Sequence, residues 1–290
     1  MAHMGLGRNL KEVEKYEEAI KYFDAATALD KEYVDAYAFR AESQLQLKKY
    51  DEATDNILNA LLLYPNHKKT LLLMLTLKEE ARQLMIPKLK VQMMKNADDF
   101  QWPFYIGEVY EASNEFKSAL PYYDKALSLE FSSGIVRRLS YCYKQLGHFK
   151  NSMKYIDLAS KLDSTDAGDL ATKIDLYAYM YDMDNAMASA DRYVKQEVDY
   201  NYAYRKRAVL KIMQKKYEEA VEDLNMAIVL APKTVASYSH RGRCYLKLGK
   251  QSLAEADFKK VLELDPDYTT FVSAYALYFL GRTDEAFAAF

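Results

Sequence analysis

The sequence contains few of the residues that break secondary structure or cross-link a chain. Its 290 residues include nine glycines, six prolines and two cysteines. Such small numbers of glycine and proline leave little room for flexible linkers or low-complexity segments. Long apolar runs are also missing. The nearest candidate, Leu71 to Leu77, is far shorter than the run of about 18 residues that a membrane-spanning helix needs. We therefore predict an ordered protein without membrane insertion.

Charge excess and enzyme signatures are missing as well. Forty Lys and Arg stand against 42 Asp and Glu, which gives a net charge of −2. This balance predicts neither nucleic acid nor an acidic membrane as a partner. The sequence has no G-x-S-x-G, no glycine-rich phosphate loop, no H-E-x-x-H and no C-x-x-C. We therefore predict no enzyme activity, no metal site and no cofactor.

What the sequence does contain is a repeat. Residues 201–234, NYAYRKRAVLKIMQKKYEEAVEDLNMAIVLAPKT, read as two short amphipathic helices closed by Pro232. The marker positions are Tyr204, Arg207, Ala208 and Lys211 in the first helix and Tyr217, Ala220, Leu224 and Ala227 in the second. This pattern resembles the tetratricopeptide repeat, which runs W-x2-L-G-x2-Y, then A-x3-F, then P. The resemblance implies an all-α, right-handed solenoid, or superhelix.

The same pattern recurs along the chain. The aromatic position that precedes the E-A-like pair of each unit is held by Tyr16, Tyr50, Phe116, Phe149, Met183 and Tyr217, and Gln251 and Thr283 hold the equivalent place in the last two units. One further unit fits in the wide gap between Tyr50 and Phe116, so we predict about nine helix-turn-helix units. We interpret residues 1–4 as a vector-derived leader and residues 5–290 as a single array. The predicted units are 5–33, 34–67, 68–99, 100–132, 133–166, 167–200, 201–234, 235–266 and a truncated 267–290.

A small residue follows three positions after each of these eight residues and lets the two helices of a unit approach closely. These residues are Ala19, Ala53, Ala119, Ser152, Ala186, Ala220, Ala254 and Ala286. A large residue follows four positions later, on the same helical face. These are Phe23, Ile57, Tyr123, Ile156, Leu224 and Phe258. The sixth unit departs from the pattern, because small Ala190 and large Tyr193 have changed places.

The third unit matches the repeat least well. Residues 70–85 are predicted to form one helix, and Pro87 is predicted to begin the next. The unit is also rich in methionine. Two interpretations stay open here: degenerate packing that bends the stack, or a methionine-lined binding site.

Three arginines occupy a position where the family pattern has leucine. Arg207 and Arg241 have an acid at a matching place in the second helix, Asp223 and Asp257, and Arg40 has Asn56 there. We predict that each pair ties the two helices of a unit together; ligand contact is the alternative.

The two cysteines, Cys142 and Cys244, also sit at equivalent repeat positions, which favours buried packing over a disulfide. A reducing compartment follows, and we predict a cytoplasmic location. The bacterial periplasm is the alternative, if a signal peptide has been removed.

The resemblance also implies where a ligand would bind. In this family the first helices line a concave groove that holds an extended or helical peptide. The groove positions in units four to eight read Phe104, Tyr105, Arg137, Arg138, Tyr141, Lys144, Tyr179, Tyr202, Arg205, Lys206, His240, Arg243 and Lys247. Units two to four add mostly acids: Asp35, Phe39, Glu42, Glu79, Glu80, Glu108 and Glu111. We therefore predict a groove that is acidic in its first half and basic in its second. The alternative is that tyrosine merely fills helix surfaces.

The function predicted on these grounds is a protein–protein interaction scaffold that binds a peptide or partner protein in the groove. A regulatory or substrate-recruiting arm of a larger protein, with its catalytic or effector domain beyond residue 290, is the alternative. An RNA-binding helical repeat is a further one. A chaperone-tail receptor is not expected, because the asparagine positions of that family subtype read Glu42, Glu108, Tyr141, Val209 and Arg243. A homodimer through exposed terminal repeats, using Phe287 and Phe290, is also predicted as possible.

Overall fold

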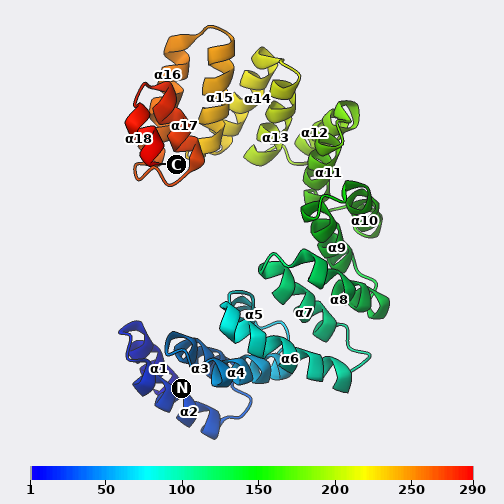
Figure 1. Cartoon of the computed structure of the whole chain (residues 1–290), viewed down its shortest axis with the longest axis vertical. Helices are drawn as coiled ribbons and strands as arrows, with labels where there is room; N and C mark the ends of the chain where they lie inside the picture. Colours follow the sequence, from blue (N-terminus) through cyan, green and yellow to red (C-terminus); the bar gives the residue numbers. More distant parts are fainter. Residues whose placement is uncertain (1, 290) are drawn as a thin grey trace. The chain divides into compact units, whose positions relative to one another are not determined.

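All regular secondary structure in the computed structural model, which describes residues 2–289, is α-helical. The chain divides into two compact units, Met1–Tyr155 and Ile156–Phe290, and α10 (Phe149–Leu162) crosses the boundary (Figure 1). The first unit contains α1 (Ala2–Glu12), α2 (Tyr16–Leu29), α3 (Val34–Gln46), α4 (Tyr50–Leu63), α5 (Lys68–Leu75), α6 (Glu79–Lys95), α7 (Gln101–Ala112), α8 (Phe116–Leu129) and α9 (Ser133–Gln145). The second contains α11 (Gly168–Tyr179), α12 (Met183–Gln196), α13 (Asn201–Met213), α14 (Tyr217–Leu230), α15 (Val235–Lys247), α16 (Gln251–Leu264), α17 (Phe271–Phe279) and α18 (Thr283–Ala288). None of the helices within residues 2–289 is long and apolar enough to cross a membrane.

Each of the eight residues that anchor the repeat pattern is the first residue of a helix in the structure. The eight residues open α2, α4, α8, α10, α12, α14, α16 and α18. Two positions before each of these residues the backbone turns into the left-handed region, with φ between 58° and 76°. These turn residues are Glu14, Lys48, Asn114, Gly147, Tyr181, Lys215, Gly249 and Gly281. The turn reverses the chain, so that each second helix packs back on the first.

The core of each hairpin depends on matched side-chain sizes. Where the first helix carries glycine, an aromatic ring fills the space: a Cβ on Gly107 would lie 2.7 Å from the Tyr123 ring, and one on Gly242 would lie 2.9 Å from the Phe258 ring. The sixth hairpin reverses this order. There Ile174 on α11 is the large residue and Ala190 on α12 is the small one, both in one buried cluster. The sequence showed Ala190 in the place of a large residue, with Tyr193 three positions on, and the structure adds that Ile174 of the facing helix compensates for the small Ala190.

The third hairpin differs from the prediction. The predicted helix over 70–85 is wrong, because α5 ends at Leu75 and α6 begins at Glu79. The Thr76 hydroxyl donates to the Leu72 carbonyl at 2.8 Å, and α6 then starts with two acids, which suit a helix N-terminus. Pro87 lies inside α6 instead of opening a helix.

Residues far apart in this region pack into one core. Met74 and Met85 are buried in it with Leu61 and Leu89, whereas Met94 is exposed. Helix α5 packs on α3, α4 and α7, and α6 packs on α4 and α7. These contacts favour the packing interpretation of the methionines over a binding site.

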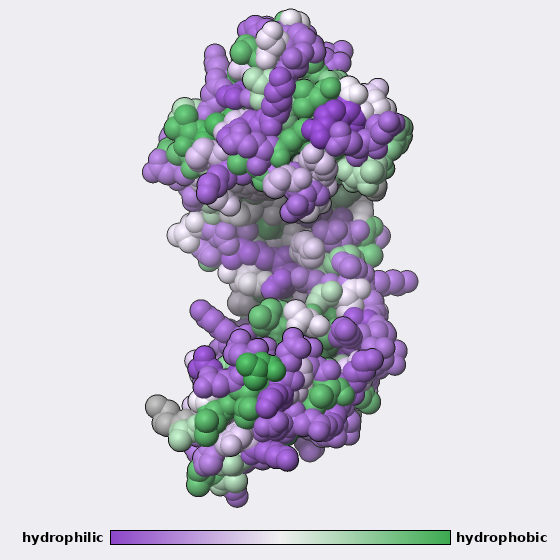
Figure 2. All heavy atoms as spheres, turned by 90° about the vertical axis from the view of Figure 1, so that its left-hand side faces the viewer, coloured by the Kyte–Doolittle hydropathy of each residue, from purple (hydrophilic) through white to green (hydrophobic). Residues whose placement is uncertain are grey.

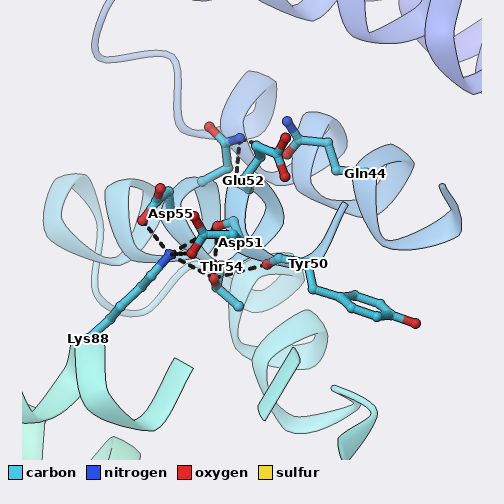
Figure 3. Close-up of polar contacts among 8 residues, drawn as sticks. Gln44, Tyr50, Asp51, Glu52, Thr54, Asp55 and Lys88 are labelled. Atoms are coloured by element: carbon cyan, nitrogen blue, oxygen red, sulfur yellow. Dashed lines mark hydrogen bonds and ion pairs between the residues drawn. The ribbon is translucent and has the colours of Figure 1, made fainter. Parts of the chain in front are cut away.

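Helix α6 is fastened to α4 by a lysine (Figure 3). The Lys88 Nζ lies 2.8 Å from Asp51 Oδ1 and 2.6 Å from Asp55 Oδ1, and it donates to the Thr54 hydroxyl at 2.9 Å. In Figure 3 the Lys88 side chain extends from its helix into this group of oxygens. The contact stabilises the place where the regular hairpin is interrupted.

The three predicted arginine pairs are present. Arg207 bonds both oxygens of Asp223, at 2.9 and 2.6 Å, and Arg241 bonds both oxygens of Asp257, at 2.9 and 2.7 Å. The Arg40 Nε donates to Asn56 Oδ1 at 3.0 Å.

Each of these arginines also reaches back to the preceding second helix, 16 residues upstream. The partners there are Asp24 for Arg40, Asp191 for Arg207 and Asn225 for Arg241. One guanidinium therefore joins three helices, which is more than the prediction proposed.

Helix α1 begins at Ala2, and Met4 is buried against the core that contains Phe23. Residues 2–4 are thus part of the first hairpin. Phe290, one of the two residues named for a dimer contact, lies outside the described residues.

Candidate functional site

Two of the predicted groove residues are internal. The side chain of Tyr105 on α7 is buried, and its hydroxyl donates to the Pro65 carbonyl at 2.7 Å. The Phe104 ring is half-buried and packs at a tilt against Tyr123. Both side chains contact neighbouring helices, and Tyr105 presents no free surface to a ligand.

Three of the predicted acids on the first helices of residues 1–155 are engaged by cations. Glu108 and Glu111 on α7 accept from Arg138 at 3.0 and 2.8 Å. Burial raises the pKa of Glu108, and the Arg138 charge acts in the opposite direction. Glu42 on α3 lies 3.2 Å from Lys11 and 2.7 Å from Lys69.

Two further acids are misplaced in the prediction. Glu79 and Glu80 open α6, the second helix of its hairpin, because the predicted helix over 70–85 does not form. The first helices of residues 1–155 therefore offer a ligand fewer unpaired carboxylates than the sequence suggested.

An aromatic ring with three cations around it replaces the expected acidic surface. The charged groups of Arg8, Lys11 and Lys69 lie 5.2, 5.5 and 4.3 Å from the centroid of the Phe39 ring. Each distance is within the range of a cation–π contact. A pocket of about 390 Å³ opens beside them between α3 and α5.

The remaining predicted residues of the first unit lie on α9. Arg137 donates to the Ser133 hydroxyl at 3.2 Å. The Lys144 ammonium lies 5.8 Å from the centroid of the exposed Tyr141 ring. This short stretch keeps accessible aromatic and basic groups together.

In the second unit, the predicted residues gather on successive first helices. On α13 the Arg205 guanidinium lies 5.1 Å from the centroid of Tyr202, and the Lys206 ammonium lies 5.3 Å from it. Lys206 also forms an ion pair with Asp175 of α11. Tyr179, near the end of α11, is 57% exposed. We call Tyr202, Arg205, His240, Arg243 and Lys247 the basic face.

Helix α15 contributes the other part of the basic face. The Arg243 guanidinium lies 5.3 Å from the centroid of Tyr275 on α17, and Lys247 is exposed one turn further along α15. Burial lowers the pKa of His240 to about 4, and the charges of Arg243 and Arg205 lower it too. The imidazole is therefore neutral at pH 7.

Two pockets open along the basic face. One, of about 260 Å³, is lined by residues that include Ile174, Tyr202, Arg205, Leu210 and His240. The other, of about 410 Å³, is lined by residues that include Ile212, Tyr217, Arg243, Lys247, Tyr275 and Phe279. Each combines apolar walls with cationic groups, as a peptide-binding surface requires.

Three residues at these pockets were missed by the sequence argument. Tyr275 and Phe279 repeat the first-helix positions of Arg243 and Lys247 one unit later, so extending the same reading into the ninth unit would have found them. Asp175 could not be singled out, because its importance lies in its pairing with Lys206 from the next hairpin.

The cations of the basic face differ in how they are paired. Within residues 2–289, no carboxylate lies within 4.0 Å of Arg205, Arg243 or Lys247, whereas Lys206 has Asp175. On the same two helices, the bracing arginines Arg207 and Arg241 are fully engaged. The unpaired charges are thus confined to the side that carries the pockets.

The surface of the protein is mixed. Figure 2 shows one face of the protein, on which mainly hydrophilic side chains surround separate hydrophobic patches. Exposed large apolar side chains of the second unit include Tyr179, Val198, Val229, Leu253, Tyr278 and Phe287.

Comparison with known proteins identifies the repeat. Family profiles described as tetratricopeptide repeat match residues 4–67, 106–132, 138–166 and 235–268. Superkiller complex protein 3 of Mus musculus is 28% identical over 219 residues, which are 68% of this chain and 13% of that protein. The Hsp70-Hsp90 organizing protein of Triticum aestivum is 45% identical over 56 residues, 19% of this chain and 10% of that protein. The chain thus spans about an eighth of the mouse relative's length.

A solved structure agrees on the fold. A tetratricopeptide repeat protein from Parabacteroides merdae superposes with a TM-score of 0.56 at 15% sequence identity, covering 85% of this chain and 98% of that one. The matched profiles cover regular hairpins in both compact units, and the helix starts and turns follow one scheme in every hairpin except the third. The chain belongs to the tetratricopeptide repeat family.

Proposed function

We propose that this protein is an interaction scaffold whose basic face holds a peptide of a partner protein. The observation that carries the proposal is the group of unpaired cations, Arg205, Arg243 and Lys247, beside aromatic rings and two pockets. Apolar walls give a peptide contact area, and the cations orient it. Tetratricopeptide arrays are built for such contacts, because stacked hairpins present a long surface of first helices.

Binding without catalysis is the activity proposed. Residues 2–289 contain no group of three or more His, Cys, Asp or Glu that could hold a metal ion. The imidazole of the basic face, His240, is kept neutral by burial and by the charges of Arg243 and Arg205, and within the described residues it has no carboxylate or hydroxyl hydrogen-bond partner. We propose a protein or peptide as the ligand, and neither nucleic acid nor membrane.

The experiment is a peptide-display selection on the full chain, followed by affinity measurement of the selected sequences. Arg205→Glu with Arg243→Glu is expected to weaken binding at least about tenfold, since two attractive contacts become repulsive. Arg192→Glu on α12, an exposed arginine away from the pockets, is the matched control and should leave the affinity nearly unchanged. Selected peptides that bind the double variant as tightly as the parent protein would refute the proposal.

A second candidate is a recruiting arm within a larger protein. It is favoured by the small share of the mouse relative, 13%, that the chain covers. In that case the basic face would bring a partner or substrate to a domain elsewhere in the same polypeptide. Pull-down with the full-length gene product and with residues 1–290 alone would compare the two candidates, since a scaffold retains its partner in both forms.

Two minor proposals concern location and assembly. We propose a cytoplasmic location, with the bacterial periplasm as the alternative; Cys142 and Cys244 are buried free thiols. We also propose that a homodimer could form through terminal repeats, because Phe287 is 72% exposed on α18. Light scattering of the parent protein and of Phe287→Ser tests the second proposal, which fails if both have the same molar mass.

A further inference from the structure

Arg205, His240 and Arg243 occupy neighbouring first helices and act on one another. His240 and Arg243 are three residues apart on α15, so their side chains leave the same helical face. Arg205 of α13 lines the 260 Å³ pocket together with His240. Both arginines also act electrostatically on the imidazole. Arg205 and His240 therefore share one small pocket, and Arg243 lies beside His240 on the same helical face, at the edge of the neighbouring 410 Å³ pocket.

The charges around this volume leave it positive. The acid that faces the pocket, Asp175 of α11, is engaged by Lys206. Tyr202 and Tyr275 hold the two guanidinium groups by their rings, at 5.1 and 5.3 Å, and contribute no negative charge. Rings that fix an arginine without neutralising it leave its N–H groups available.

We propose that Arg205, His240 and Arg243 form a receptor for a single oxyanion group, a carboxylate or a phosphoryl group, carried by the bound peptide. The inference rests on the proposed function and specifies the chemistry of its ligand. Guanidinium groups match the geometry of both oxyanions and bond them in pairs. A neutral imidazole adds an N–H donor between the arginines without adding a third positive charge.

The walls of the pocket agree with a side chain that carries its charge on a short apolar stem. Ile174 of α11 and Leu210 and Met213 of α13 line the same pocket as the two donors Arg205 and His240. The stem would contact these apolar groups while the oxyanion meets the nitrogen donors. A lysine or arginine side chain would bring its charge against like charges, which is unfavourable.

The test is an NMR titration of the full chain with capped amino acids as probes. N-acetyl-phosphoserine amide and N-acetyl-glutamate amide present the two oxyanions, and N-acetyl-glutamine amide is the uncharged probe. The His240 ring signals are assigned with His240→Gln. Without a probe His240 titrates at about 4. A bound oxyanion is expected to raise its pKa by about 1–3 units, saturably, because an opposite charge now lies beside it.

Two variants distinguish binding at a specific site from nonspecific electrostatic attraction of the probe. Arg205→Gln with Arg243→Gln should remove the saturable, probe-induced change, and Arg192→Gln on α12 should preserve it. The comparison uses the probe-induced change, since removing the arginines alters the imidazole even without a probe. A His240 signal that moves with neither oxyanion, or equally with glutamine amide, overturns the inference. So does an equal response in the double variant.

The two probes also identify the source of the oxyanion. Phosphoserine binding at least about tenfold tighter than glutamate would assign the receptor to a phosphorylated peptide; similar affinities would assign it to an acidic one. The result is distinguishable from the fate of the proposed function. If the selected peptides show no preference for an oxyanion, the scaffold proposal holds and the oxyanion receptor is refuted. If the probes bind saturably but no peptide is selected, the oxyanion receptor holds and the scaffold proposal is refuted.

Discussion

At the scale of single residues, the hairpins depend on complementary volumes and on completed charge pairs. Position 242 requires glycine because the Phe258 ring fills the space that a Cβ would need. Asp223 is buried because Arg207 and Lys211 both reach it. The sequence shows the partners of such pairs, since they recur at one spacing, and the structure shows what a change at either partner would do.

Gly242→Ala should destabilise the second unit by about 1–3 kcal/mol, the usual cost of overpacking a core. The added Cβ would lie 2.9 Å from the Phe258 ring. Chemical denaturation of the parent and the variant measures the change. Phe258→Leu in the same chain should restore part of the loss by making room. Gly134→Ala is the control, because a Cβ there meets only the Ser132 hydroxyl, at 4.0 Å. Equal losses in Gly242→Ala and Gly134→Ala would contradict the size-matching argument.

Asp223→Ala should cost about 1.5–3 kcal/mol in unfolding free energy, the range for hydrogen bonds to charged groups. The substitution leaves Arg207 and Lys211 without their shared buried partner. Asp191→Ala removes the exposed partner of Arg207 and should cost only about 0–1 kcal/mol. If the two variants lose the same free energy, the brace is not buried in the way described.

At the scale of helices, the ends and turns decide where each element begins. The left-handed turn residue recurs two positions before the second helix, yet only Gly147, Gly249 and Gly281 among the eight are glycines. The third hairpin breaks where Thr76 turns its hydroxyl back onto the helix. Helix α17 begins a few residues after Asp265, whose carboxylate accepts hydrogen bonds from the residues that follow it. These local interactions outweigh the periodicity of apolar residues in deciding where a helix begins and ends.

Tyr181→Gly should stabilise the second unit by about 0.5–1 kcal/mol. Tyr181 adopts φ 59°, a conformation that costs side-chain-bearing residues about 1–2 kcal/mol, and part of the gain is offset by the entropy of glycine in the unfolded chain. Its side chain is 87% exposed, so little packing is lost. Thermal unfolding is measured for this variant and for Ala188→Gly. Ala188 is an exposed residue within α12, where glycine should lower the stability. A lower stability for both would show that the turn stores no strain.

Asp265 should make the stability of α17 depend on acid. Its carboxylate accepts from the backbone and hydroxyl groups of Thr269 and Thr270 and from the Ser273 hydroxyl. The Ser273 hydroxyl bond in particular holds the pKa of Asp265 well below its usual range. A depressed folded-state pKa gives stability that is complete above the ordinary pKa of about 4 and is lost as the pH falls towards the folded value.

The corresponding measurement compares the parent protein with Asp265→Asn across pH. The advantage of the parent should be constant from about pH 7 to pH 5 and shrink below about pH 4. Hydrogen exchange of α17 amides gives a local readout that global unfolding could hide. A difference that stays constant down to about pH 2 would show that the carboxylate is not charged when it bonds these donors.

At the scale of the whole molecule, contacts run mainly between neighbouring helices. Within each unit, helices pack chiefly on the next one or two along the chain. Stability in such arrays is a sum of hairpin and nearest-neighbour terms, so a local change has a local effect. The two compact units are then expected to respond separately to core substitutions.

Gly107→Ala should lower the stability of residues 1–155 and leave residues 156–290 nearly unchanged; Gly242→Ala should do the reverse. Each added Cβ would meet a ring within its own unit, Tyr123 or Phe258. Hydrogen exchange with mass spectrometry in increasing denaturant resolves the two units. Loss of protection along the entire chain in either variant would indicate one cooperative unit and refute the prediction.

By itself, the sequence determined the repeat, its anchor positions and the arginine braces. Each of these depends on residues at fixed short spacings, and helical periodicity makes such spacings physically meaningful. Only the tertiary structure decided which predicted groove residues are available. Arg138 is engaged by Glu108 and Glu111, and Tyr105 is buried with its hydroxyl bonded to the Pro65 carbonyl, whereas Arg205 and Arg243 have no carboxylate partner within residues 2–289. These outcomes depend on partners brought together from different hairpins, which no spacing within one repeat specifies.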